Sequence, residues 1–195
     1  MSVSTLHWVR QGLAREVVVG RRAVSAIAVG AMVACLAMAA YARIPLPFTP
    51  VPITLQTFFV LIAGAALGKR LGTLSTSLYL LLGTLGLPIF TGIWLGATTG
   101  YLVGFAAAGW LIAAIVSRVR RASTARIVLA MLAGTLVIYL FGAGWLAFGM
   151  GLGVEKAIVV GVLPFAVGDA LKLAAAAAFV RVGHERLRAL FPGSR

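Results

Sequence analysis

Long apolar runs separated by short polar segments set the pattern along this chain. Four runs, at residues 23–42, 101–117, 127–148 and 157–180, approach the length of about 20 residues that a helix needs to cross a bilayer. A further apolar stretch, residues 52–87, is interrupted by Lys69 and Arg70. Because a charged pair is costly in mid-bilayer, this stretch predicts two short spans joined by a tight turn. The pattern therefore predicts six transmembrane helices.

The composition agrees with a membrane protein. The chain has 195 residues, of which 62% are hydrophobic and 11% charged, and a mean hydropathy of +1.06. Soluble domains are about 45–50% apolar and about 25% charged. These values exclude a soluble enzyme, a disordered chain and a disulfide scaffold, since Cys35 is the single cysteine. The fold class that we expect is an all-α integral membrane protein.

Positive charge is distributed unevenly between the two sides of the predicted bundle. The formal net charge is +13, and the side that holds both termini receives nearly all of the Lys and Arg residues, whereas the other receives Arg43 and Lys156. This asymmetry predicts that both termini are cytoplasmic, in a cell membrane such as the bacterial inner membrane. Because topology accounts for the clusters, we expect no nucleic-acid partner. The expected division is a basic cytoplasmic segment at 1–22, a membrane domain at 23–182 and a basic cytoplasmic tail at 183–195.

Two opposite charges lie inside the last predicted span. Asp169 and Lys172 are three residues apart, so they share one helical face and are close enough to pair. A neutralised pair that only orients helices is one interpretation. The other, which we favour, is a ligand site that offers both an acceptor and a cationic donor.

A proline-rich loop (residues 42–55) follows the first span. Its four prolines alternate with apolar residues, which predicts an extended segment that packs over the mouth of the bundle as a lid. Gln56, just inside the second span, supplies a buried amide for a ligand or for a hydrogen bond between helices.

Two other stretches carry candidate residues. The uncharged segment 86–101 is rich in Gly, Thr and aromatic residues, and Tyr101 could form a pocket wall, whereas Trp94 fits an interfacial aromatic belt. In the first span, Ala26, Gly30 and Ala34 recur at every fourth position. Such a small-residue face permits close approach of another helix, within the bundle or from a partner.

Energy-converting and catalytic motifs are missing from the sequence. The segment 63–70 only approximates a phosphate-binding loop, because it places Arg70 where Ser or Thr must bind magnesium. The two histidines, His7 and His184, lie in the polar ends, and no metal-ligand cluster is evident. We therefore expect a protein that binds or conducts a ligand, with no enzymatic activity, no cofactor and no metal. A cleavable signal peptide ending near Ala42 is a less favoured alternative.

Four motifs of the chain, in order and with consistent spacing, resemble those of the BioY family, the biotin-binding S components of energy-coupling factor (ECF) transporters. The likeness extends over about residues 23–180. The motifs are Ala-Arg-Ile-Pro-Leu-Pro-Phe-Thr-Pro-Val-Pro-Ile-Thr-Leu-Gln-Thr at 42–57, Gly-Leu-Pro-Ile-Phe at 86–90, Gly-Tyr-Leu-Val-Gly-Phe at 100–105 and Pro-Phe-Ala-Val-Gly-Asp-Ala-Leu-Lys at 164–172.

This resemblance implies a six-helix protein that captures biotin and works with a membrane coupling subunit and cytoplasmic ATPases, with homo-oligomers left open. Asp169 would accept ureido N–H groups, and Lys172 would meet the carboxylate or the ureido oxygen. The small-residue face of the first span would dock the coupling subunit. The other residues assigned to the biotin site are Arg43, Phe48, Thr49, Gln56, Phe90 and Tyr101. Alternatives are an S component for another vitamin and a proton-coupled secondary transporter with Asp169 as the titrating group.

Overall fold

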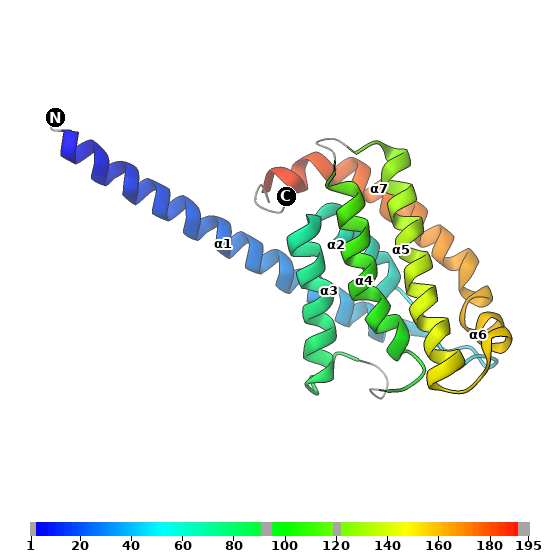
Figure 1. Ribbon diagram of the computed structural model, residues 1–195. Helices are drawn as coiled ribbons and strands as arrows, with labels where there is room; N and C mark the ends of the chain where they lie inside the picture. The colour runs from blue at the N-terminus through cyan, green and yellow to red at the C-terminus, as the bar shows by residue number, and fades with distance from the viewer. Residues whose placement is uncertain (1–2, 91–94, 119–121, 191–195) are drawn as a thin grey trace.

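The computed structural model describes residues 3–90, 95–118 and 122–190, and within them it is mostly helical (Figure 1). Trp94, expected in the aromatic belt, lies outside the described residues. The helices and strands, in chain order, are α1 (Val3–Tyr41), β1 (Arg43–Ile44), β2 (Ile53–Thr54), α2 (Gln56–Ala66), α3 (Gly68–Thr84), α4 (Thr99–Val116), α5 (Thr124–Gly144), a π-helical turn η1 (Trp145–Gly149), α6 (Val154–Gly161), a 3₁₀ turn η2 (Leu163–Phe165) and α7 (Ala166–Leu190).

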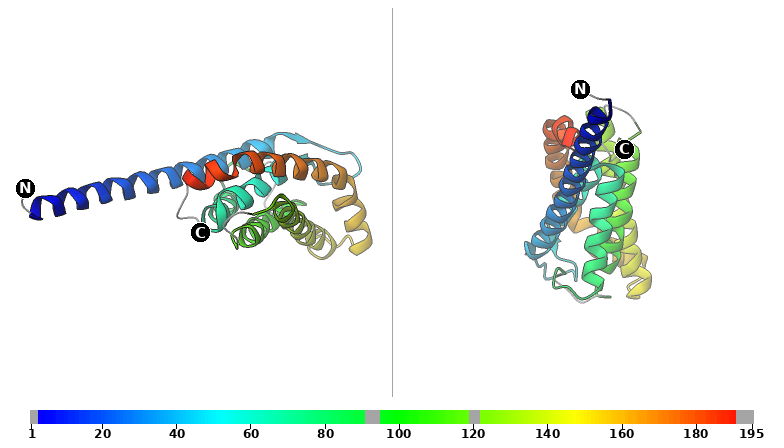
Figure 2. Two further views of the ribbon diagram at one scale, coloured as in Figure 1. Left: turned by 90° about the horizontal axis from the view of Figure 1, so that it is seen from above. Right: turned by 90° about the vertical axis from the view of Figure 1, so that its left-hand side faces the viewer.

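Helix α1 is continuous across the boundary between residues 22 and 23, where the sequence suggests that a basic segment meets a membrane span. Its 39 residues correspond to about 58 Å at 1.5 Å per residue. Its second half packs against the bundle through Val29, Leu36 and Ala39, and the first half projects away from the bundle (Figures 1 and 2). The bundle itself is therefore formed by the second half of α1 together with the later helices.

Four of the described helical segments are long and apolar enough to cross a membrane. They are Arg22–Tyr41, Thr99–Val116, Thr124–Gly149 and Val154–Gly183, and Gln56–Ala66 is a shorter apolar helix. The remaining expected span coincides with α3, whose 17 residues include Lys69 and Arg70 in the first turn. The structure thus gives a multi-helix membrane protein whose second and third predicted spans are shorter than the others.

The tight turn predicted between these two helices is present. Helix α2 ends at Ala66 and is capped by Leu67, and Gly68, the first residue of α3, adopts a φ of 77°. A side chain at this position would be strained, because φ values of this sign favour glycine. Lys69 and Arg70 are exposed just after the turn, and the Lys69 Nζ lies 5.5 Å from the centre of the Trp110 ring on α4.

The last span, which we expected to be one helix over residues 157–180, is broken. Helix α6 ends at Gly161, the turn η2 contains Pro164, and α7 begins at Ala166. Pro164 has no N–H to donate to the carbonyl of Val160, four residues earlier, so the helical hydrogen bonding stops there. As a result α6 and α7 run in different directions (Figure 1).

The proline-rich loop is extended and packed against the bundle, as predicted. Its ends pair as a short antiparallel ladder in which Arg43 faces Thr54 and Ile44 faces Ile53. Between these strands, Val51 is buried within the same apolar cluster as Leu36, Tyr101 and Phe165. The loop therefore contributes Val51 to the core, while most of its other residues stay exposed.

Helices α4 and α5 pack closely against each other. A Cβ atom at Gly100 would lie 2.2 Å from the carbonyl oxygen of Phe141, so only glycine allows this approach. Helix α5 begins with a capping bond in which the Arg126 amide donates to Ser123 Oγ over 3.2 Å. This close pairing brings Tyr101 of α4 and Tyr139 of α5 to one internal cavity.

Candidate ligand-binding site

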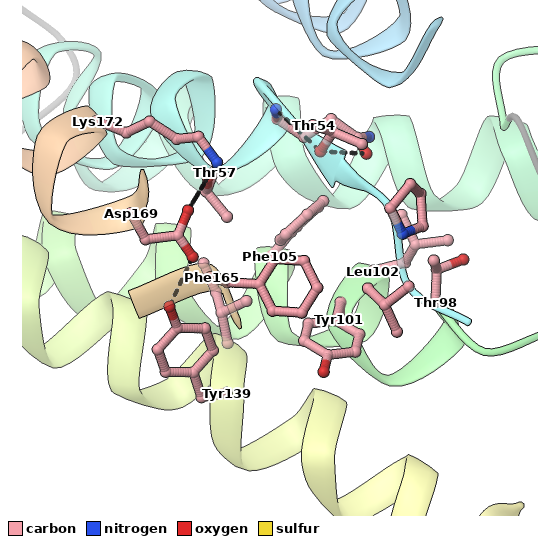
Figure 3. A pocket seen from close by; sticks show the side chains of 14 residues that line it. Thr54, Thr57, Thr98, Tyr101, Leu102, Phe105, Tyr139, Phe165, Asp169 and Lys172 are labelled. Carbon is pink, nitrogen blue, oxygen red and sulfur yellow. Dashed lines mark hydrogen bonds and ion pairs between the residues drawn. The ribbon is translucent and has the colours of Figure 1, made fainter. Parts of the chain in front are cut away.

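A cavity of about 50 Å³ lies between α2, α4, α5, α7 and the proline-rich loop. Most of its wall is apolar or aromatic, and polar side chains gather at the α7 end (Figure 3). The lining residues are Val51, Pro52, Thr54, Gln56, Thr57, Thr98, Tyr101, Leu102, Phe105, Ile138, Tyr139, Phe165, Asp169 and Lys172.

Asp169 and Lys172 form the ion pair that their spacing predicts. Lys172 Nζ donates to Asp169 Oδ1 over 2.7 Å, one turn along α7. Asp169 is only 5% exposed. Because water does not solvate the carboxylate, its charge depends on Lys172 and on hydrogen bonds for stabilisation. Thr57 Oγ1 of α2 donates to Oδ1 over 3.0 Å, and the Tyr139 hydroxyl of α5 donates to Oδ2 over 2.7 Å. The carboxylate therefore joins three helices at the edge of the cavity.

Gln56 also lines the cavity. Its side chain is buried, and its Nε2 donates to the hydroxyl of Tyr79 over 2.8 Å. Tyr79 in turn donates to the carbonyl of Ile89 over 3.0 Å. The hydrogen bond between helices that we considered for Gln56 is thus present, and the same amide also lines the cavity.

Tyr101 lines the cavity with its ring and uses its hydroxyl at the break between α6 and α7. The hydroxyl donates to the carbonyl of Gly161 over 2.6 Å. Thr49 Oγ1, from the proline-rich loop, donates to the neighbouring carbonyl of Val160, also over 2.6 Å. The two carbonyls that lose their helical partners at Pro164 are therefore satisfied by side chains from α4 and from the loop.

Four residues of the expected site lie outside the cavity lining. Thr49 bonds to Val160 instead, and Phe48 is 62% exposed on the loop. Arg43 is exposed in β1. The Phe90 ring packs edge-on against Tyr79, with centroids 5.3 Å apart. Of the eight expected residues the structure thus brings Gln56, Tyr101, Asp169 and Lys172 to one cavity.

Sequence reasoning missed several lining residues, above all Tyr139 and Thr57, which bond to Asp169. Phe105 and Phe165 were also missed, although both belong to motifs that carry the family resemblance. For Tyr139 the available signal was a phenolic hydroxyl in the mainly apolar run 127–148. A buried hydroxyl needs a partner, and Asp169 is the acidic residue in the later spans.

The arrangement suits a small ligand that is mostly apolar and carries polar groups at one end. The aromatic walls would bury apolar surface, while Asp169 accepts and Lys172 donates hydrogen bonds in a dry environment, where such bonds are strong. Within the part of the chain that the structure describes, no group of three His, Cys, Asp or Glu residues could hold a metal ion. Fold and site together define a class, the multi-helix membrane proteins that enclose a pocket for a small organic molecule.

Comparison with known proteins names the family within this class. The model of the BioY family matches residues 12–189, and the chain belongs to that family. It is 43% identical over 141 residues to the probable biotin transporter BioY of Pyrococcus horikoshii, covering 69% of this chain and 82% of the relative. It is 39% identical over 142 residues to the biotin transporter BioY of Thermotoga maritima, covering 70% and 82%.

A solved structure agrees with this membership. The crystal structure of the S-component for biotin from an ECF-type ABC transporter superposes with a TM-score of 0.76 at 27% identity. The similarity covers 86% of this chain and 92% of that protein. The family resemblance seen in the sequence motifs is thereby confirmed, and the chain is a transport protein rather than an enzyme.

Proposed function

We propose that this chain is the membrane subunit that captures biotin for uptake, and that the cavity beside Asp169 and Lys172 is its binding site. The observation that carries the proposal is a buried, hydrogen-bonded ion pair at one end of a cavity lined by aromatic side chains. The names of the relatives, biotin transporters and an S-component for biotin, support the choice of ligand.

The chemistry of biotin is compatible with this lining. Biotin has an apolar bicycle and tail, a ureido group with two N–H donors and one carbonyl acceptor, and a carboxylate. In a widened cavity the bicycle would lie between Phe105 and Phe165, and the ureido group would direct an N–H toward Asp169 and its carbonyl toward Lys172. Lys172 Nζ has three donors and gives one to Asp169, so the ammonium can donate to a ligand as well.

Binding requires the cavity to widen. Ligand pockets commonly measure about 300–1,000 Å³, whereas this cavity holds about 50 Å³. The most readily moved wall is the proline-rich loop, since among the described contacts a single side-chain bond, from Thr49 to Val160, ties its tip to α6. We therefore propose that this loop opens to admit biotin and closes over it.

The proposal includes six membrane crossings, with α6 and α7 together forming the last, and places both termini in the cytoplasm of a bacterial cell. The exposed cations Lys69 and Arg70 at the α2–α3 turn, and Arg118 after α4, support this orientation. The proline-rich loop and the mouth of the cavity then face outward, where biotin is captured.

Energised uptake would use an ECF coupling subunit and cytoplasmic ATPases. Ala26, Gly30 and Ala34 are all exposed on the side of α1 that does not pack on the bundle. A Cβ atom added at Gly30 would meet no atom within 4 Å. We propose this face as the docking surface for the coupling subunit, because a flat small-residue stripe permits close helix packing in a membrane.

The proposal is tested by equilibrium binding of radiolabelled biotin to the purified chain in nanodiscs. We expect tight, saturable binding that weakens at least about 30-fold in Lys172→Met, because removing one partner of a buried charge pair commonly costs 2–5 kcal/mol. The matched control is Lys156→Met, an exposed lysine of α6 outside the cavity lining, which should leave binding unchanged.

Two results would contradict this function. Absence of biotin binding by the folded chain would overturn the assignment of biotin as the ligand. A panel of other vitamins would then be tested to identify the substrate. Biotin flux driven by a pH gradient in liposomes that contain this chain alone would favour the secondary-transporter alternative.

A further inference from the structure

The carboxylate of Asp169 is almost fully engaged within the protein. An ionised carboxylate has about four lone-pair positions. In the described structure Oδ1 accepts from Lys172 Nζ at 2.7 Å and from Thr57 Oγ1 at 3.0 Å, and Oδ2 accepts from the Tyr139 hydroxyl at 2.7 Å. One position, on Oδ2, is left for a ligand.

Tyr139 determines where this position lies. Figure 3 shows the Tyr139 ring approaching Asp169 from the side opposite Lys172 and Thr57, so the carboxylate is held between donors from α5 on one side and from α2 and α7 on the other. A carboxylate held by one side only could turn about its Cβ–Cγ bond, whereas donors on both oxygens fix its plane.

We propose that Tyr139 is a positioning residue for ligand recognition, which presents the remaining lone pair of Asp169 Oδ2 to a single N–H donor of the ligand. The inference rests on the proposed function and deepens it. It states that Asp169 accepts a hydrogen bond from one of the two ureido N–H groups of biotin. The other N–H must be accepted elsewhere or remain without a strong partner.

Tyr101 provides a matched control on the same cavity. It is a second tyrosine that lines the site, but its hydroxyl donates to the carbonyl of Gly161 over 2.6 Å rather than to Asp169. Figure 3 shows this hydroxyl directed away from Asp169. Tyr101→Phe and Tyr139→Phe therefore each remove one tyrosine hydroxyl from residues that line the cavity. Only Tyr139→Phe removes a hydrogen bond to the Asp169 carboxylate.

The experiment is a thermodynamic cycle between protein and ligand. Dissociation constants are measured for biotin and for its two mono-N-methyl derivatives on the ureido group, with the unaltered chain, Tyr139→Phe and Tyr101→Phe. We expect one derivative to bind the unaltered chain about 10- to 100-fold more weakly than biotin, because a charge-assisted bond to Asp169 is lost. This derivative is the informative ligand of the cycle.

Tyr139→Phe should weaken the binding of biotin about tenfold. It should weaken the binding of the informative derivative by less than about threefold, because that derivative no longer bonds to Asp169. Tyr101→Phe should weaken both ligands by the same factor. Equal factors for the two ligands in Tyr139→Phe would overturn the inference and leave Tyr139 as a structural contact between α5 and α7, with the proposed function intact. Absence of biotin binding by the unaltered chain would overturn the proposed function and this inference with it.

Discussion

Thr49 and Val160 are joined by a hydrogen bond of 2.6 Å, although 111 residues separate them in the sequence. The bond exists because Pro164 leaves the carbonyl of Val160 without a helical donor. The next carbonyl, of Gly161, is bonded in the same way by Tyr101. The interruption of one helix thus provides the attachment point for the proline-rich loop and for a wall of the cavity.

Replacing Thr49 with valine should weaken the closed position of the loop. The side chain keeps its shape, but the Val160 carbonyl loses its donor, at a cost of about 1 kcal/mol. We expect dissociation of bound biotin to become about fivefold faster, measured by chase with unlabelled ligand. Thr84→Val is the control, because the Thr84 hydroxyl bonds within its own helix, to Leu81. An unchanged dissociation rate in Thr49→Val would show that this bond does not hold the loop.

We expect biotin binding to require both Asp169 and Lys172. For the stability of the fold, losing one charge of the pair should be worse than losing both. Lys172→Met leaves the buried Asp169 charge without its cation, which typically costs about 3–5 kcal/mol, so the unfolding temperature in detergent should fall. Replacing both residues, as Asp169→Leu with Lys172→Met, should recover part of the lost unfolding temperature but not biotin binding, because Thr57 and Tyr139 lose their acceptor. A double variant less stable than Lys172→Met would refute this account.

Gly161→Ala should destabilise the helix break. The added Cβ would lie 2.6 Å from the Tyr101 hydroxyl and 2.6 Å from Leu146 Cδ1, so the side chains must shift and the Tyr101 bond would be displaced. We expect a loss of about 1–3 kcal/mol, seen as a lower unfolding temperature. Gly144→Ala, where no atom lies within 4 Å of the new Cβ, should be neutral or slightly stabilising. Similar effects of the two substitutions would argue against close packing at Gly161.

A bulky residue at Gly30 should impair assembly with the coupling subunit without affecting ligand binding. Gly30 is exposed on α1, so Gly30→Leu should leave biotin binding to the isolated chain unchanged. Co-purification with an ECF coupling subunit should fall at least about tenfold, because the helices could no longer approach closely. The control is Ala31→Leu, at the neighbouring exposed position. Retained assembly in Gly30→Leu would move the docking surface elsewhere.

The features that sequence predicted correctly are those fixed by local geometry. The spacing of Asp169 and Lys172 places both on one face of any helix, and the ion pair follows. The prolines of residues 42–55 exclude a helix whatever the rest of the chain does. The positive φ at Gly68 agrees with the turn expected beside Lys69.

The features that sequence did not predict depend on contacts between distant segments. The bond from Tyr139 to Asp169 joins residues 30 apart and requires α5 and α7 to cross at that depth. The position of Phe90 also depends on a distant contact, because its ring packs where Gly83 leaves room for it, and a Cβ atom at Gly83 would lie 2.2 Å from the Phe90 ring. Pro164 was a local signal for the break after α6. Hydropathy does not reveal the break, because the apolar run continues on both sides of Pro164.

The neutrality of the Asp169–Lys172 pair has an electrical consequence for transport. Because the two side chains cancel, the proposed complex with biotin would carry the charge of the biotin carboxylate itself. Moving one negative charge inward through an inside-negative membrane potential costs about 2.3 kcal/mol per 100 mV. In that complex the membrane potential would oppose net entry of biotin, so the work of uptake would have to come from another source, such as ATP hydrolysis by the proposed partner subunits.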